Sequence, residues 1–292
     1  MHRNTDAAGT RGGPEGPPRC ISATKNHPFI RLLLTTCLLL TADLQAQERW
    51  SAWLAGSALD IDYTEFDDSG AWFNAEDGWI GGIETGAEFR HDDWSVHTTL
   101  GWWKGTVDYS SRTATAETDE EILDFHVRAG RVMFRQHGTT MQLNAGLGYR
   151  DWQRDIAPGN PAALYETYTW AYGSLGLQLR KEFNARTALS ADVHISRPLN
   201  PEIKVNFAAG NDPVTLDLGE ENGFRLALAV EHRLQPGLSL RISPWYEAWD
   251  LGRSPTVTLT QNGMPVGFVN EPRSETRNIG ISLGLKWYSG TP

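Results

Sequence analysis

Two side chains with the chemistry of a hydrolase lie two positions apart in the segment 189–196. Asp192 and His194 have the spacing that places both side chains on one face of an extended strand. A carboxylate beside an imidazole orients the ring, which can then take a proton from water. Asp60 and Asp62 repeat this spacing, and we expect them to face the same interior. These four residues are the candidate catalytic residues, and the chemistry they suggest is hydrolysis.

A second group combines aromatic and charged side chains. The segment 148–156 reads GYRDWQRDI, and alternating polar and aromatic residues follow after a short loop. The residues that converge on one face are Arg150, Trp152, Glu166, Tyr168 and Trp170. One interpretation is a binding cleft for a polar ligand or a lipid head group, anchored by the arginine and the tryptophans. The other is an aromatic and ionic plug that fills the interior of the fold.

Cofactor and nucleic-acid motifs do not occur in the sequence. We find no zinc-ligand spacing, P-loop or dinucleotide fingerprint, and therefore expect no metal and no cofactor. The formal net charge is −10, and no basic face is visible, which argues against a nucleic-acid partner. These features leave hydrolysis, ligand binding or a structural role.

The elements that would position these side chains are β-strands. Apolar and polar residues alternate with a period of two, as in the stretch 279–287, IGISLGLKW, and helical periodicity is missing. We predict about ten strands, at 49–63, 78–90, 94–105, 121–134, 140–152, 164–181, 187–196, 223–233, 238–250 and 275–288.

The connections between these strands alternate between short and long. The long ones are 64–77, 106–120, 153–163, 197–222 and 251–274. The polar face of the strands is rich in glycine, which suits a crowded lumen, and aromatic residues gather near both strand ends. Outer-membrane β-barrels have short periplasmic turns, long external loops and apolar-out alternation. We therefore predict an all-β, antiparallel up-and-down transmembrane barrel in the outer membrane of a Gram-negative envelope.

The first 46 residues have the features of an export signal. Residues 29–46 read FIRLLLTTCLLLTADLQA, a basic residue followed by a short apolar core and small residues. We expect a non-structured leader and signal peptide at 1–46 and one barrel domain at 47–292. Both cysteines, Cys20 and Cys37, fall in the leader. Five of the 26 basic and three of the 36 acidic residues also lie there, so the net charge of the remainder is −12.

The final strand and the strand number carry a resemblance to known families. IGISLGLKW resembles the C-terminal signal of bacterial outer-membrane barrels, which implies the barrel assembly machinery as a partner; five residues follow Trp287 here. Chain length and strand number resemble those of the omptins, ten-stranded outer-membrane proteases. That resemblance implies an Asp–His dyad near the mouth, with Asp192 and His194 as its counterparts. The acidic pair of the second external loop has as counterparts only Asp108 and the 119–121 run.

The interior charges are expected to close the lumen. A barrel of about ten strands has an interior that side chains can largely fill. We predict ion pairs between Arg150 and Glu166 and between Glu231 and Arg241. Strand-like runs in the last two long loops predict hairpins beyond the membrane. We therefore predict a plugged barrel with a structural or surface-binding role through its external loops, lying among lipopolysaccharide and binding an external ligand; the alternative is an omptin-like peptidase.

Overall fold

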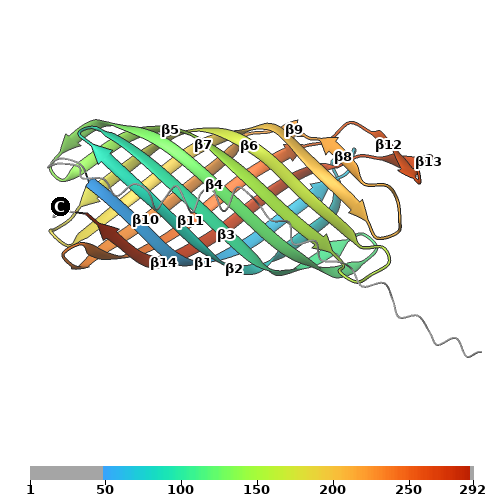
Figure 1. Cartoon of the computed structure of the whole chain (residues 1–292), viewed down its shortest axis with the longest axis horizontal. Coiled ribbons are helices and arrows are strands. Elements are labelled where there is room, and N and C mark those ends of the chain that lie inside the picture. The colour runs from blue at the N-terminus through green and yellow to red at the C-terminus, as the bar shows by residue number, and fades with distance from the viewer. Residues whose placement is uncertain (1–48, 290–292) are drawn as a thin grey trace, which may run out of the picture. The chain divides into compact units, whose positions relative to one another are not determined.

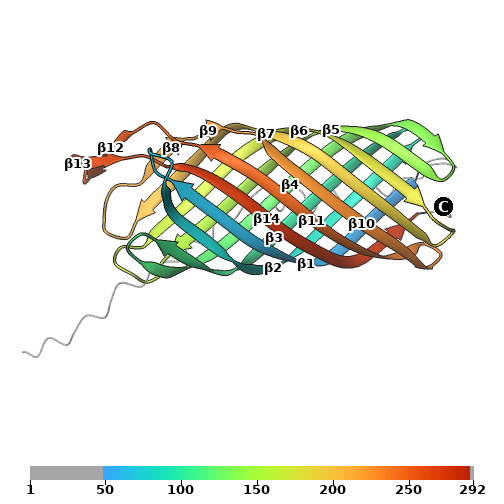
Figure 2. The ribbon, with the colours of Figure 1, turned by 180° about the vertical axis from the view of Figure 1, so that it is seen from behind.

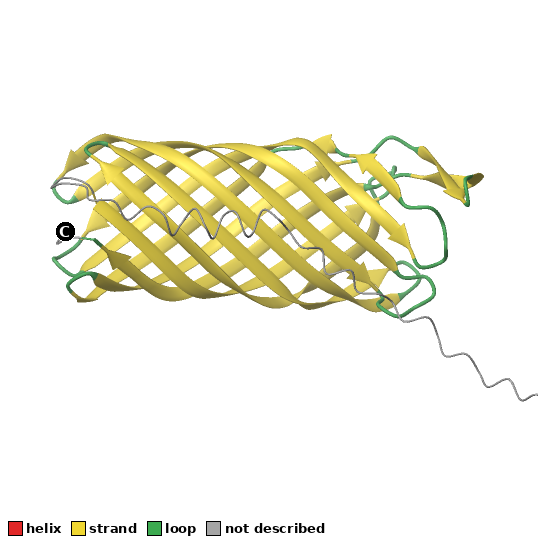
Figure 3. Ribbon diagram, viewed as in Figure 1, coloured by secondary structure: helices red, strands yellow, loops and turns green. Residues whose placement is uncertain are grey.

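The computed structural model describes residues 49–289, and the predicted leader lies outside them. In the described part of the chain all regular elements are strands (Figure 3). No helix there is long and apolar enough to cross a membrane. The strands are β1 (Arg49–Phe66), β2 (Trp72–His91), β3 (Trp94–Ser111), β4 (Thr115–Gln136), β5 (Thr139–Ile156), β6 (Leu164–Glu182), β7 (Thr187–Phe207), β8 (Val214–Asp217), β9 (Gly219–Glu220), β10 (Gly223–Gln235), β11 (Leu238–Gly252), β12 (Val257–Gln261), β13 (Met264–Val269) and β14 (Arg273–Tyr288).

Ten of these strands form a closed antiparallel barrel (Figure 1). Strands β1 to β7 pair in chain order, β14 pairs with both β1 and β11, and β10 pairs with β11 and β7, which closes the wall (Figure 2). Strand β8 pairs with the outer part of β7, and β9 pairs with β11. The prediction of an all-β barrel with ten wall strands is confirmed.

The wall strands are longer than predicted at one end of the barrel. Strand β2 begins at Trp72 instead of 78, β4 begins at Thr115 instead of 121, and β7 continues to Phe207 instead of 196. At the other end the predicted and observed ends agree to within two residues. The predicted long loops are therefore partly strand. Strands β12 and β13 form a separate hairpin at the lengthened end, as the strand-like runs at 257–259 and 266–269 indicated (Figure 1).

Two aromatic levels border an apolar band on the outer surface of the wall. Trp94, Phe183 and Trp287 lie exposed at the short-turn end, and Trp79 and Trp102 lie at the other level. Exposed leucine, isoleucine and valine side chains occupy the band between them. This arrangement is that of a membrane-spanning barrel, in which amphipathic rings mark both interfaces.

Beyond the second aromatic level the outward face becomes acidic. Asp62 is paired in register with Asp77, Asp77 with Asp108, and Asp108 with Glu117, and all four are exposed. Such a row of carboxylates cannot face lipid. The strands therefore continue past the membrane into a part of the barrel that we call the outer extension.

Glycines on the inner face make room for large rings. A Cβ atom at Gly86 would overlap the ring of Trp53, and one at Gly280 would overlap the ring of Trp245. The rings thus lie flat over the neighbouring strand, where any other residue would push them into the lumen. The glycine-rich inner face expected from the sequence is accounted for by this packing.

Candidate functional site

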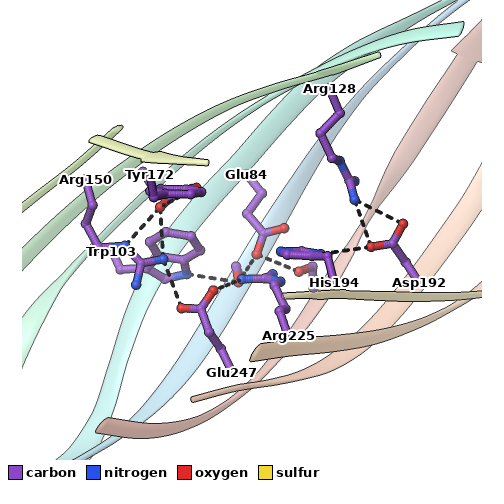
Figure 4. A network of polar contacts seen from close by, with 12 residues as sticks. Glu84, Trp103, Arg128, Arg150, Tyr172, Asp192, His194, Arg225 and Glu247 are labelled. Carbon is purple, nitrogen blue, oxygen red and sulfur yellow. Dashed lines mark hydrogen bonds and ion pairs between the residues drawn. The ribbon is translucent and has the colours of Figure 1, made fainter. Parts of the chain in front are cut away.

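The candidate dyad lies inside the barrel on β7. The Nδ1 atom of His194 is 3.2 Å from Oδ1 of Asp192, so the predicted side-by-side placement is present. Arg128 on β4 donates hydrogen bonds to both carboxylate oxygens of Asp192, at 2.8 and 3.1 Å (Figure 4). Val193 and Ile195, which flank the dyad on the outward face, are exposed and belong to the apolar band. The dyad therefore lies in the lumen within the membrane-spanning part of the wall.

Asp60 and Asp62 do not join this dyad. The inward residues of β1 are Leu59, Ile61 and Tyr63, all buried, so the two aspartates between them point outward. Their expected place on the inner face is wrong. The reason is that in the outer extension the interior is the packed apolar core and the outward face meets water, which reverses the polarity rule of the membrane segment.

A polar cavity of about 140 Å³ surrounds the dyad. Its wall carries charges of both signs, and most are paired. Glu231 accepts hydrogen bonds from Arg180 at 2.8 Å and from Lys286 at 3.0 Å. The predicted pair of Glu231 with Arg241 is therefore not formed, because two nearer cations occupy the carboxylate.

An ionic layer centred on Arg150 borders this cavity, and Figure 4 shows Arg150 and Arg225 on either side of Glu247. Arg150 donates to Asp124, its register partner on β4, at 2.9 Å and to Glu247 at 2.9 Å. Glu247 also accepts from Arg225 at 3.0 Å. The predicted pair of Arg150 with Glu166 is wrong, because Glu166 lies further along the barrel in the outer extension.

The outer extension is filled by aromatic and apolar side chains. Trp152 and Tyr168 stack with their ring centroids 5.0 Å apart, and Trp152 meets the edge of Tyr63 at 5.2 Å. We call this interior the outer plug. Its fully buried large side chains are Trp152, Arg154, Tyr63, Tyr168, Leu59, Ile61, Ile203, Leu216, Leu251, Glu76, Glu120 and Asn278.

A single buried arginine at the centre of the outer plug faces several carboxyl groups. Arg154 forms ion pairs with Glu76 at 3.0 Å and with Glu166 at 2.9 Å. It is also 3.5 Å from Glu65 and 3.8 Å from Glu120. All four glutamates are buried, which leaves more negative than positive formal charge in a region closed to water.

Burial and mutual repulsion change how these carboxyl groups bind protons. The outer plug lies beyond the membrane-spanning segments. Burial raises the pKa of Glu166 to about 7, with Arg154 opposing the shift and Glu65 adding to it. Burial also raises the pKa of Glu65, and it raises the pKa of Glu120 well above the usual range. Burial and mutual repulsion thus favour the protonated forms of these carboxyl groups relative to exposed glutamates.

The five residues predicted as a binding group are all buried, and the structure divides them between two neighbouring levels of the interior. Trp152, Tyr168 and Glu166 belong to the outer plug. Arg150 and Trp170 lie on the membrane side of the outer plug and line a small pocket where β7 and β10 meet. Packing and ion pairing account for the placement of all five, which is the arrangement of the alternative interpretation, a plug.

Sequence reasoning missed Arg154, Glu76 and Glu120. Arg154 lies two residues beyond Trp152 on the same face, so continuing the alternation would have found it. Glu76 and Glu120 lay in segments interpreted as loops, where no inward face is defined. Among residues 49–289 no group of three His, Cys, Asp or Glu side chains is arranged to hold a metal ion.

Comparisons with known proteins agree with the barrel. A family model described as "Outer membrane protein beta-barrel domain" matches residues 32–286. A search of curated proteins gave no match. Among solved structures, the outer membrane protease OmpT from Escherichia coli is similar at 10% identity and a TM-score of 0.60, covering 85% of this chain and 99% of that one. The outer membrane protein OprG from Pseudomonas aeruginosa has 10% identity, a TM-score of 0.43, and coverage of 85% and 100%. At such identities, the likeness to OmpT is one of fold alone.

Proposed function

Because the chain belongs to the outer membrane protein β-barrel domain family, we propose that it is a closed barrel that acts by binding at its external end. The outer membrane is its location. The observation that carries the proposal is the outer plug, whose side chains fill the interior of the outer extension. A filled outer lumen leaves no water path for diffusion, and open pores need wider barrels.

The hairpin of β12 and β13 is the best candidate for the binding surface. Met264, Val266 and Phe268 follow one another at every second position and are 67%, 53% and 78% exposed. An apolar row that is exposed to water costs solvation free energy and is typical of a contact surface. The hairpin projects from the lengthened end of the barrel (Figure 1), which the long connections assign to the outside. The class of partner this surface suits is one with an apolar or lipid-bearing face.

Binding by the hairpin is tested on cells that display the protein. Fluorescent phosphatidylcholine vesicles are mixed with the cells, and retained fluorescence is measured. We expect the double variant Met264→Ser, Phe268→Ser to lose several-fold in retention, because its apolar contact area is removed. Phe73→Ser, another exposed aromatic of the outer extension, is the matched control and should retain vesicles like the wild type. Equal retention by all three proteins would contradict the proposal.

Hydrolysis is the second candidate function, favoured by the Asp192–His194 contact of 3.2 Å. The outer plug blocks access from outside, so a substrate could reach the dyad only from the short-turn end of the barrel, through the polar cavity that the dyad lines. Cleavage of a peptide library and of lipid A by the refolded barrel tests this function. If His194→Ala and Asp192→Asn both abolish an activity that the wild type has, hydrolysis replaces binding as the function.

Contacts with lipopolysaccharide and recognition by the barrel assembly machinery also belong to the proposal. The alternating final strand that ends in Trp287 supports recognition for assembly. The two aromatic levels support a stable position among the lipids.

A further inference from the structure

Four side chains of the outer plug form a chain of short oxygen contacts. The hydroxyl oxygen of Tyr63 is 2.8 Å from Oε1 of Glu65 and 3.1 Å from the hydroxyl oxygen of Tyr168. The Tyr168 oxygen is 2.5 Å from Oε1 of Glu271. The chain therefore contains three oxygen-to-oxygen contacts, all of them buried.

When Glu65 and Glu271 are both ionised, this row of contacts has one hydrogen fewer than it needs. Each contact needs a hydrogen between its two oxygens, and a tyrosine hydroxyl supplies one. Tyr63 and Tyr168 together supply two hydrogens for three contacts. Arg154 donates to the Tyr168 oxygen at 2.9 Å but places no hydrogen in any of the three. A proton on one of the end carboxyl groups completes the chain.

The surroundings place that proton on Glu271. Glu65 accepts a hydrogen bond from Asn74 at 2.8 Å and lies 3.5 Å from Arg154, and both contacts favour its ionised form. Among residues 49–289, the Tyr168 hydroxyl is the one side chain hydrogen-bonded to the Glu271 carboxyl. A protonated Glu271 then donates to Tyr168, Tyr168 donates to Tyr63, and Tyr63 donates to Glu65. Burial and the charges of Glu65 and Glu166 raise the pKa of Glu271 well above its usual range, which agrees with this assignment.

The groups around Glu271 offer little compensation for a negative charge. The titratable side chains that face it or its immediate neighbours from the surrounding strands are Tyr63 and Glu65 of β1, Glu76 of β2, Tyr109 of β3, Glu120 of β4, Arg154 of β5 and Glu166 and Tyr168 of β6. Arg154 is the one cation of this group, and it is already paired with Glu76 and Glu166.

Glu271 also connects the plug to the external hairpin. It lies between the end of β13 and the start of β14. Its backbone N–H donates to Oγ of Ser254 at 2.8 Å, and the Ser254 N–H donates to its carbonyl at 3.0 Å. Ser254 lies in the segment that leads from β11 to β12. Both stems of the hairpin are thus joined at the residue whose side chain enters the plug.

We propose that the outer plug is a proton-binding site in which a proton on Glu271 holds the stems of the β12–β13 hairpin against the barrel, and loss of that proton releases them. The direction follows from linkage: a carboxyl group with a raised pKa in the closed form stabilises that form in acid, and this stabilisation is lost as the pH rises. The proposal does not depend on what the hairpin binds, because release is measured on the protein alone.

Limited tryptic digestion of the refolded full chain tests the release. Trypsin cleaves after Arg253 and Arg273, which bracket the hairpin, and fragment masses identify these two cuts. Wild type and Glu271→Gln are compared at each pH, so the pH dependence of trypsin cancels. Glutamine keeps a donor toward Tyr168 and cannot ionise. We expect the ratio of wild-type to variant cleavage to rise with pH by up to about tenfold per unit, the limit for one linked proton.

The control is Glu221→Gln, an exposed carboxyl in the loop before β10, which should follow the wild type. Infrared spectroscopy gives a second measurement, because a protonated carboxyl has its own carbonyl band. That band should be present in the wild type at neutral pH and weakened in Glu271→Gln. A cleavage ratio that is constant with pH, or an unchanged carboxyl band in the variant, would overturn the proposal. So would hairpin release that responds to added Ca²⁺ and not to pH.

Discussion

Arg154 holds together groups that would otherwise repel one another. Besides its carboxylate partners, its guanidinium lies 4.3 Å from the ring centre of Tyr63 and 5.6 Å from that of Tyr168. A buried charge that contacts both carboxylates and aromatic faces is stabilised from several directions. Its removal leaves Glu76 and Glu166 buried without their cation.

We expect Arg154→Met to lower the free energy of unfolding by about 3–5 kcal/mol, the range for breaking a buried ion pair from one side. Urea unfolding of the refolded barrel measures this change. Arg253→Met removes an exposed pair with Asp68 and should cost less than about 1 kcal/mol. Equal stability of the two variants would show that Arg154 is not the centre of the outer plug.

The carboxyl cluster also predicts how stability depends on pH. The pKa of Glu166 is raised to about 7, so its protonated form is favoured in the folded protein. Unfolding restores the ordinary, lower pKa, and the folded state therefore loses stability as the pH rises from that ordinary pKa to about 7, above which Glu166 adds no further change. We expect Glu166→Gln to flatten this dependence in urea unfolding across the acid and neutral range. A wild type that gains stability as the pH rises from the ordinary glutamate pKa to about 7 would contradict the buried, protonated cluster.

Two neighbouring glycines of strand β2 differ in whether a larger side chain could be accommodated. Gly82 faces inward, and a Cβ there would overlap the ring of Trp103 and the backbone of Trp102. Gly81 faces outward with no atom within 4 Å of such a Cβ. Two adjacent glycines of the same strand thus differ only in the face they occupy.

Gly82→Ala should therefore destabilise the barrel by about 1–3 kcal/mol, the usual cost of overpacking. Gly81→Ala should be neutral or slightly stabilising, since alanine reduces the freedom of the unfolded chain. Thermal unfolding of the two variants against the wild type measures both effects. A larger loss at Gly81 than at Gly82 would mean that the assignment of faces is reversed.

At the level of the whole molecule, the strand order and the membrane-spanning interior could be predicted because one rule applies there. In the membrane-spanning part, apolar side chains face lipid and polar side chains face the lumen. The alternation of side chains along β7 therefore predicts that Asp192 and His194 face the lumen, where they lie. In the outer extension the outward face of the barrel meets water instead of lipid, and the apolar side chains pack in the interior. The rule that polar side chains face the lumen therefore places Asp60 and Asp62 on the wrong face. It also pairs Glu166 with Arg150, whereas its partner is Arg154.

The ion-pair partners were harder to predict than the strands, because they depend on register and height around the barrel. Arg150 meets Glu247 across the lumen, from a strand far away in the sequence. Alternation fixes which face a side chain occupies and carries no information on which distant strand lies opposite. Glu271, which lies in a loop that enters the plug, has no periodic signal at all.

Conductance across a planar lipid bilayer tests the closed outer lumen most directly. The refolded wild-type barrel is inserted, and current is recorded at both signs of voltage, below and above neutral pH. We predict no stepwise current, because the outer plug fills the barrel even when the hairpin stems are released. Sustained, discrete conductance steps from the wild-type protein would contradict the closed barrel and with it the proposed binding function.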